Sequence, residues 1–88
     1  VLVEGTNLSN LRVLDLSNNQ LTTFTAFIEH LPALWELDLS FNQIKEIPLD
    51  LPQLQKLNIL RMKGNALSNK QKQAIKQVFA DSRTKVVL

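Results

Sequence analysis

Several residue types that support chemistry are missing from this chain of 88 residues. It has no cysteine and no tyrosine, and it has one histidine and two glycines. Without cysteine there is no disulfide framework, thiol nucleophile or thiolate zinc site, and one histidine does not make a histidine-based metal site. No apolar run approaches the roughly 18 residues that a membrane-spanning helix needs. We therefore expect no metal, no cofactor and no transmembrane segment.

What the chain does contain is leucine and asparagine. Leucine occupies 17 positions and asparagine 8, within a chain of 10.0 kDa whose apolar fraction is 44%. A chain of this length supports one hydrophobic core and no second independently folded unit. The sequence therefore predicts a single domain over residues 1–88.

Three segments of the chain share one template. They read LRVLDLSNNQL at 11–21, LWELDLSFNQI at 34–44 and LNILRMKGNAL at 57–67, so every position recurs after 23 residues. The pattern L-x-x-L-x-L-x-x-N-x-L at such a period resembles the leucine-rich repeat family. In each unit the alternating leucines point inward from a short strand, and stacked units bury them as a continuous ladder.

The resemblance implies a structural role for the asparagine of the template. In the family this residue forms a ladder along the turns, where its amide donor and acceptor pair with backbone groups that would otherwise be buried without partners. The residues at this position are Asn19, Asn42 and Asn65. Replacing Asn42, the middle one, is expected to cost about 1–3 kcal/mol for each polar group left unpaired.

The segments that return from one strand to the next differ in sequence. Phe24, Phe27, Ile28 and Leu31 have helical spacing, which predicts a short helix ending before Pro32. The equivalent stretch at 44–54 contains two prolines and is expected to be extended or a 3₁₀ turn.

The two ends of the chain depart from the repeat. Ser68 and Gln71 have the spacing of a helix capping box, and the following apolar stripe predicts a helix over 69–80, with a final strand over 84–88. This end resembles the caps of bacterial leucine-rich repeat proteins. Residues 1–10 align with the second half of an earlier repeat, so we expect the chain to be the end of a longer solenoid, with residues 1–10 folding over the first strand as the alternative.

The resemblance implies an α/β fold. It is a short right-handed solenoid with a parallel β-sheet on its concave face, helical, 3₁₀ and extended returns on its convex face, and a C-terminal cap of a helix and a strand. The expected boundaries are a partial repeat at 1–10, repeats at 11–33, 34–56 and 57–67, and the cap at 68–88.

The concave face is the usual ligand surface of the family, and it is where we expect a protein partner. Trp35 and Phe41 stand out, because aromatic side chains at positions that need no apolar residue often anchor a partner, although each could instead lie against a neighbouring column or the flank of the solenoid. The predicted partner-binding residues are Val13, Asp15, Trp35, Glu36, Asp38, Phe41, Ile59, Arg61 and Lys63.

Catalysis is not expected on this face. Asp15 and Asp38 fall about 5 Å apart on adjacent strands, but an open face offers no pocket to shift a pKa, and Arg61 in the same row offers Asp38 an ordinary ion pair. The only histidine, His30, lies on a return segment and cannot activate a serine at the end of a strand. The sequence therefore predicts a protein that is not an enzyme.

Charge is divided unevenly along the chain. Residues 1–55 carry seven acidic and two basic side chains, a balance of −5, whereas residues 56–88 carry eight basic and one acidic, a balance of +7. The basic part lacks interleaved aromatic residues and any recognition motif, so nucleic acid is a poor candidate for a partner. The asymmetry instead predicts head-to-tail electrostatic association.

The resulting functional hypothesis is a non-catalytic module that binds a protein through its concave face. Two alternatives remain. The chain could be the substrate-docking arm of a larger effector or ubiquitin-ligase-like protein, or a fragment that self-associates through an open sheet edge at its N-terminal end. The compartment stays open between a soluble cytoplasmic protein and a secreted effector.

Overall fold

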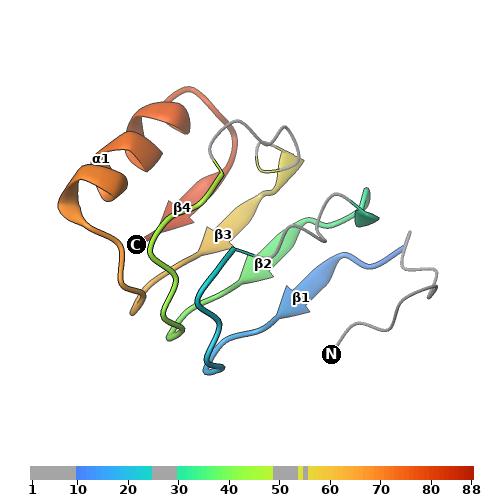
Figure 1. The fold of residues 1–88 in the computed structure, drawn as a ribbon. Helices are drawn as coiled ribbons and strands as arrows, with labels where there is room; N and C mark the ends of the chain where they lie inside the picture. The colour runs from blue at the N-terminus through green and yellow to red at the C-terminus, as the bar shows by residue number, and fades with distance from the viewer. Residues whose placement is uncertain (1–9, 25–29, 49–53, 55) are drawn as a thin grey trace.

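A computed structural model describes residues 10–24, 30–48, 54 and 56–88, and the description below concerns these residues (Figure 1). A single parallel sheet has the strand order β1-β2-β3-β4. Its elements are β1 (Val13–Asp15), β2 (Glu36–Asp38), β3 (Ile59–Arg61), α1 (Asn69–Val78) and β4 (Lys85–Val87). The predicted α/β fold with a parallel sheet and a terminal helix and strand is thus confirmed.

The 23-residue period becomes the register of the sheet. Leu14 pairs with Leu37, and Leu37 pairs with Leu60, so each strand repeats its neighbour after one period. The cap continues this row, because β4 places Val86 beside Leu60. A repeating sequence therefore gives a repeating register, and the cap adds a fourth strand to the same sheet.

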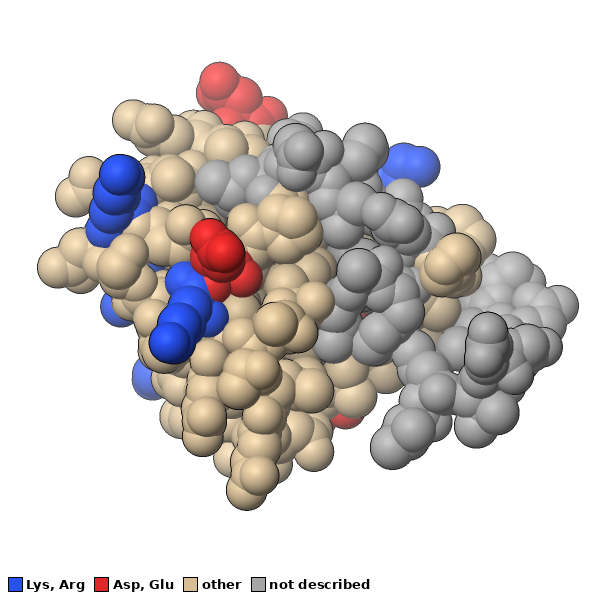
Figure 2. Space-filling model, in the orientation of Figure 1, with Lys and Arg blue, Asp and Glu red and all other residues tan. Residues whose placement is uncertain are grey.

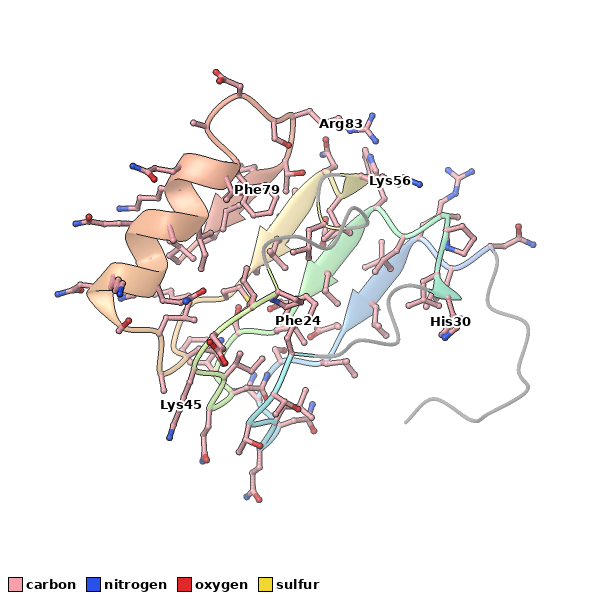
Figure 3. The ribbon with its side chains drawn as sticks, turned by 45° about the horizontal axis from the view of Figure 1, so that its top comes forward. Phe24, His30, Lys45, Lys56, Phe79 and Arg83 are labelled. Carbon is pink, nitrogen blue, oxygen red and sulfur yellow. The ribbon has the colours of Figure 1, made fainter. Side chains whose placement is uncertain are left out.

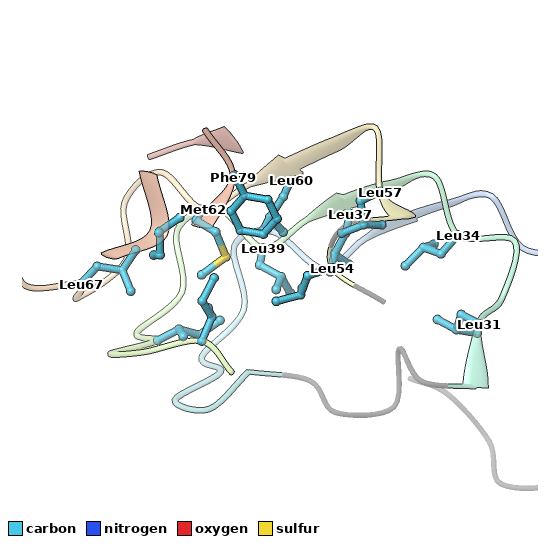
Figure 4. Close-up of a cluster of buried hydrophobic side chains, with 13 residues drawn as sticks. Leu31, Leu34, Leu37, Leu39, Leu54, Leu57, Leu60, Met62, Leu67 and Phe79 are labelled. Atoms are coloured by element: carbon cyan, nitrogen blue, oxygen red, sulfur yellow. The ribbon is translucent and has the colours of Figure 1, made fainter. Parts of the chain in front are cut away.

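The core is a ladder of these repeated apolar side chains (Figure 4). Leu37 and Leu60 are both 0% exposed, as are Leu39 and Ile44 from the neighbouring columns. Leu14, the rung of the same ladder in β1, is only partly buried. The ladder is therefore fully covered in its middle and less covered at the β1 end.

The described parts of the return segments close the core from the other side. Leu31, Ile47 and Leu54 are buried, and Leu54 and Lys56 have 3₁₀ backbone. This agrees with the extended or 3₁₀ return predicted for that stretch. The helix predicted from Phe24 to Leu31 falls mostly on residues 25–29, which lie outside the described residues.

The cap helix α1 begins where the sequence predicted. The Ser68 hydroxyl accepts a hydrogen bond of 3.1 Å from the Gln71 backbone N–H, which satisfies one free donor of the first turn. The Gln71 side chain does not complete the capping box, because it accepts from the Ile47 N–H at 3.5 Å. The helix ends at Val78 rather than 80, where the Phe79 N–H bonds to the Ile75 carbonyl and the Phe79 ring enters the core.

Two polar side chains of the cap form hydrogen bonds with the chain just before β3. Thr84 is 5% exposed, and its hydroxyl lies 2.6 Å from the Leu57 carbonyl and 3.2 Å from the Leu54 carbonyl. The Arg83 guanidinium donates to the Lys56 carbonyl at 3.0 Å, and both residues are labelled in Figure 3. These contacts satisfy carbonyl oxygens at the end of the second return, just before β3.

Candidate protein-binding face

The turns at the ends of the strands are held by asparagine side chains. Asn42 is 5% exposed, and its Nδ2 donates to the carbonyls of Leu16 at 3.1 Å and Leu39 at 2.9 Å. A weaker bond of 3.3 Å reaches the Ser40 carbonyl, and Oδ1 accepts from the Leu21 N–H at 3.2 Å. Asn42 thus joins the turns of two successive repeats.

Asn65 makes three of these four contacts one repeat later. Its Nδ2 donates to the carbonyls of Leu39 and Met62, both at 2.8 Å, and its Oδ1 accepts from the Ile44 N–H at 3.0 Å. Asn19 is exposed, and among the described residues its amide bonds within its own turn, to the carbonyls of Leu16 and Ser17. The asparagine side chains hold the strand ends at a fixed spacing.

The face of the sheet opposite the leucine ladder is called here the outer strand face. Its side chains form two rows that run across the four strands, because the register aligns equivalent residues. The first row contains Val13, Glu36, Ile59 and Lys85, and the second contains Asp15, Asp38, Arg61 and Val87. The charge along these rows changes from acidic on β1 and β2 to basic on β3 and β4.

The two aspartates of the second row close their own turns. Asp15 Oδ1 accepts from the Ser17 hydroxyl at 2.6 Å and from the Ser17 N–H at 2.9 Å, and Asp38 Oδ1 accepts from the Ser40 N–H at 3.0 Å. The hydroxyl bond and then the N–H bond lower the pKa of Asp15 below its usual value. Both carboxylates therefore stabilise the exit from a strand, a role that sequence reasoning had not assigned to them.

The ion pair predicted between Arg61 and Asp38 is wrong. Arg61 Nη1 instead lies 3.2 Å from Glu36 Oε2, on the diagonal between the two rows. Asp38, directly across from Arg61, is held by the Ser40 N–H, so its carboxylate is turned toward its own turn. Both partners of the observed pair are about one-third exposed, so the pair adds roughly 0–1 kcal/mol of stability.

The large apolar side chains that stay exposed gather at this sheet. In the described part of the chain they are Val13, Trp35 and Phe41, each with 51–54% of its surface exposed. Val13 lies in the first row, Trp35 immediately precedes β2, and Phe41 lies in the turn that follows β2. Trp35 also borders a shallow hollow of about 240 Å³ with Arg12 and Ala33.

The turn after each strand contains one residue with left-handed backbone. These are Asn18 and Phe41, both with φ of 58°, and Gly64 with φ of 79°. Asparagine and glycine adopt this conformation readily, whereas a bulky residue is strained there by about 1–2 kcal/mol. The Phe41 ring lies against Gly64, where an added Cβ would come within 2.4 Å of the ring.

Other candidate sites are less developed. A hollow of about 500 Å³ lies between the first and second returns and is lined by Thr22–Phe24 and Lys45–Pro48. His30 is exposed on its return segment and points away from the strands (Figure 3).

Within the described ranges no cluster of three His, Asp or Glu side chains is placed to hold a metal ion. No helix there is both long and apolar enough to cross a membrane.

Basic side chains are most evident at the cap end of the molecule (Figure 2). The exposed lysines of α1 include Lys70 and Lys76, and Lys85 is exposed on β4. They coat the surface of the terminal unit, where charge keeps the end of a repeat protein in water.

Strands that recur at a fixed period, pair in parallel and bury one leucine ladder define a repeat protein of the solenoid type. The family model described as "Leucine rich repeat" matches residues 5–44. A solved leucine-rich repeat protein of Leptospira interrogans superposes with a TM-score of 0.77 and 32% identity, over 92% of this chain and 20% of that one. The chain therefore belongs to the leucine-rich repeat family.

Two curated relatives come from Arabidopsis thaliana. Receptor-like protein 54 is 41% identical over 71 residues, and tubulin-folding cofactor E is 37% identical over 67 residues. These alignments cover 76% and 73% of this chain, but only 9% and 13% of the respective relatives. Since plant and bacterial proteins are both among the matches, a bacterial source stays a prediction. The family consists mainly of protein-interaction modules without catalytic activity.

Proposed function

We propose that this domain binds a protein partner through the outer strand face and does not catalyse a reaction. The observation that carries the proposal is that the large exposed apolar side chains of the described residues, Val13, Trp35 and Phe41, lie within or directly beside β1 and β2, each about half exposed. Exposed aromatic and aliphatic side chains beside charged ones are typical of interface cores and their rims. The change from acidic to basic charge along the two rows supplies a means of selecting a partner.

Affinity enrichment with matched variants tests this proposal. The immobilised chain is compared with Ile59→Lys and Trp35→Ala, which alter the outer strand face, and with His30→Ala, which alters a return segment. We expect a protein retained by the wild type to be retained by His30→Ala and to fall at least tenfold with Ile59→Lys. Equal retention by all variants would place the contact elsewhere and refute the proposal. Circular dichroism checks that each variant is folded.

Self-association is a second candidate, supported by the incomplete burial at β1. Leu11, Leu14 and Leu16 are only partly buried, whereas the equivalent residues of the second repeat are 0–4% exposed. β1 is also the terminal strand of the described sheet, and terminal strands can pair with another chain. Sedimentation equilibrium at several concentrations tests this candidate: concentration-dependent dimers that weaken with Leu14→Lys support it, and a monomer at all concentrations excludes it.

A docking role within a larger protein is the remaining alternative. It is favoured by the small share of each relative, 9–20%, that this chain spans. In such a protein the outer strand face would hold the substrate while another domain carries the activity. Joining the chain to a proximity-labelling enzyme tests the idea, since labelling of the same proteins should be lost with Ile59→Lys.

A further inference from the structure

The third repeat departs from the first two at the residues that close the turn after the strand. The first two repeats have the sequence Asp-Leu-Ser, in which the aspartate accepts a hydrogen bond from the N–H two residues later. In the third repeat Arg61 replaces the aspartate and Lys63 replaces the serine. The carboxylate that stabilises the turn is thus exchanged for two cations.

The two cations have different surroundings. Arg61 pairs with Glu36 at 3.2 Å. Lys63 is exposed, and no described side chain forms an ion pair or hydrogen bond with its ammonium group. Among the described residues, the positive charge on this turn therefore has no ion-pair partner.

A second departure lies directly beside Lys63. The Phe41 N–H donates to the Lys63 carbonyl at 2.8 Å, so the two residues occupy adjacent turns. Phe41 takes the left-handed position filled by Asn18 and Gly64 in the other repeats, and its ring rests on Gly64 with 53% of the residue exposed. The absence of a Cβ at Gly64 leaves the room that the Phe41 ring occupies, so an exposed aromatic surface lies in the turn adjacent to that of Lys63.

From this juxtaposition we infer that Phe41, Gly64 and Lys63 form a docking site for an acidic peptide segment of the partner. An apolar side chain of that segment packs on the exposed face of the Phe41 ring, and a neighbouring carboxylate pairs with Lys63. Charge complementarity selects the acidic segment, since the uncompensated charge at the site is positive. The inference rests on the proposed protein-binding function and adds the chemistry of the bound segment.

Peptide selection on the intact chain tests the inference. A phage library of random 12-residue peptides is selected on the immobilised wild type, and enriched peptides are synthesised and measured by fluorescence anisotropy. Expected sequences combine Asp or Glu with a nearby Leu, Ile, Phe or Trp. Phe41→Asn, which keeps a residue suited to left-handed backbone, is expected to weaken binding at least tenfold. Lys63→Ser, the residue of the first two repeats, is expected to weaken it about threefold to fivefold. Lys70→Ser on α1 is the matched control and is expected to bind as the wild type does.

The outcomes separate this inference from the function on which it rests. Peptides that lose affinity with Ile59→Lys but bind Phe41→Asn normally would leave the proposed function standing and overturn the docking site. Peptides without acidic enrichment, or no selected peptide, would also overturn it, whereas affinity enrichment of whole proteins judges the proposed function independently. Selection of peptides that match residues 10–24 of this chain would identify a second copy as the occupant and refute an acidic partner segment. Thermal melting of Phe41→Asn at or above the wild-type temperature shows that lost binding is not lost folding.

Discussion

Replacing the three asparagines of the turns one at a time by alanine is expected to reduce stability by different amounts. The amount depends on how many backbone groups lose their hydrogen-bond partner. In Asn42→Ala, the Leu16 carbonyl still accepts from Asn19, and the Leu39 carbonyl still accepts from Asn65. The Leu21 N–H loses its hydrogen bond of 3.2 Å to Asn42 Oδ1 and has no other acceptor among the described residues. One partly buried N–H group is left without an acceptor. We therefore expect the free energy of unfolding to fall by about 2 kcal/mol, which lowers Tm by roughly 8–16 °C.

Asn65→Ala is expected to cost more. It leaves the Ile44 N–H without an acceptor, and Ile44 is 0% exposed. It also leaves the Met62 carbonyl without a hydrogen-bond donor among the described residues. Two stranded groups predict about twice the loss of Asn42→Ala. Asn19→Ala leaves the Leu16 carbonyl bonded to Asn42, and the Ser17 carbonyl that it frees is exposed to water. The loss of stability should therefore stay below about 1 kcal/mol.

Chemical denaturation followed by circular dichroism measures the series. Gln20→Ala, at an exposed position of the same turn, is the control and should change stability by less than about 0.5 kcal/mol. Equal losses for the three asparagines, or the largest loss for Asn19→Ala, would refute the reasoning from retained partners.

Three further predictions concern the core, a strand exit and the cap. Leu37→Ala is expected to cost about 2–5 kcal/mol in denaturation experiments, and Leu14→Ala in the same column distinctly less, because Leu37 is 0% exposed and Leu14 only partly buried. Ser17→Ala removes the hydroxyl bond and should raise the pKa of Asp15 toward its usual value of about 3.9, as followed by NMR titration of the carboxyl carbon. Because the pKa of Asp15 is lowered in the folded state, its stabilisation is complete above the unfolded-state pKa and is lost as pH falls through the folded-state pKa. Ser17→Ala should narrow the pH interval between these two pKa values. Ser68→Ala is expected to lower stability by about 0.5–2 kcal/mol, as measured by chemical denaturation, and to reduce the total helical circular dichroism signal.

The sheet could be predicted from the sequence because a fixed period forces equivalent residues into adjacent positions. Once Leu14, Leu37 and Leu60 are aligned, the parallel register follows, and so does the row of outward side chains. The cap could be predicted from the apolar stripe that follows Ser68, although its end at Val78 depends on how Phe79 turns into the core.

Contacts between side chains from different repeats were less accessible to sequence reasoning. The diagonal pair of Arg61 with Glu36 arises because the Ser40 N–H already holds Asp38, a local competition that the register alone does not reveal. Thr84 was missed because its hydroxyl serves the Leu57 carbonyl 27 residues away, after the cap has docked.

The strained position of Phe41 did leave a signal in the sequence. Asn18 and Gly64 occupy the same template position, and both residue types favour left-handed backbone, so a phenylalanine between them departs from the local rule. Departures of this kind concentrate at sites where function outweighs stability. Phe41→Asn should therefore retain or raise Tm, in contrast to the core and asparagine variants.

The central claim is that the outer strand face, and not the returns or the cap, binds a protein. Its most direct test is the amount of a captured partner retained by Ile59→Lys relative to Lys70→Ser, with both variants shown to be folded. The account predicts at least a tenfold loss with Ile59→Lys and wild-type retention with Lys70→Ser. Undiminished retention by Ile59→Lys, or a loss confined to Lys70→Ser, would contradict it.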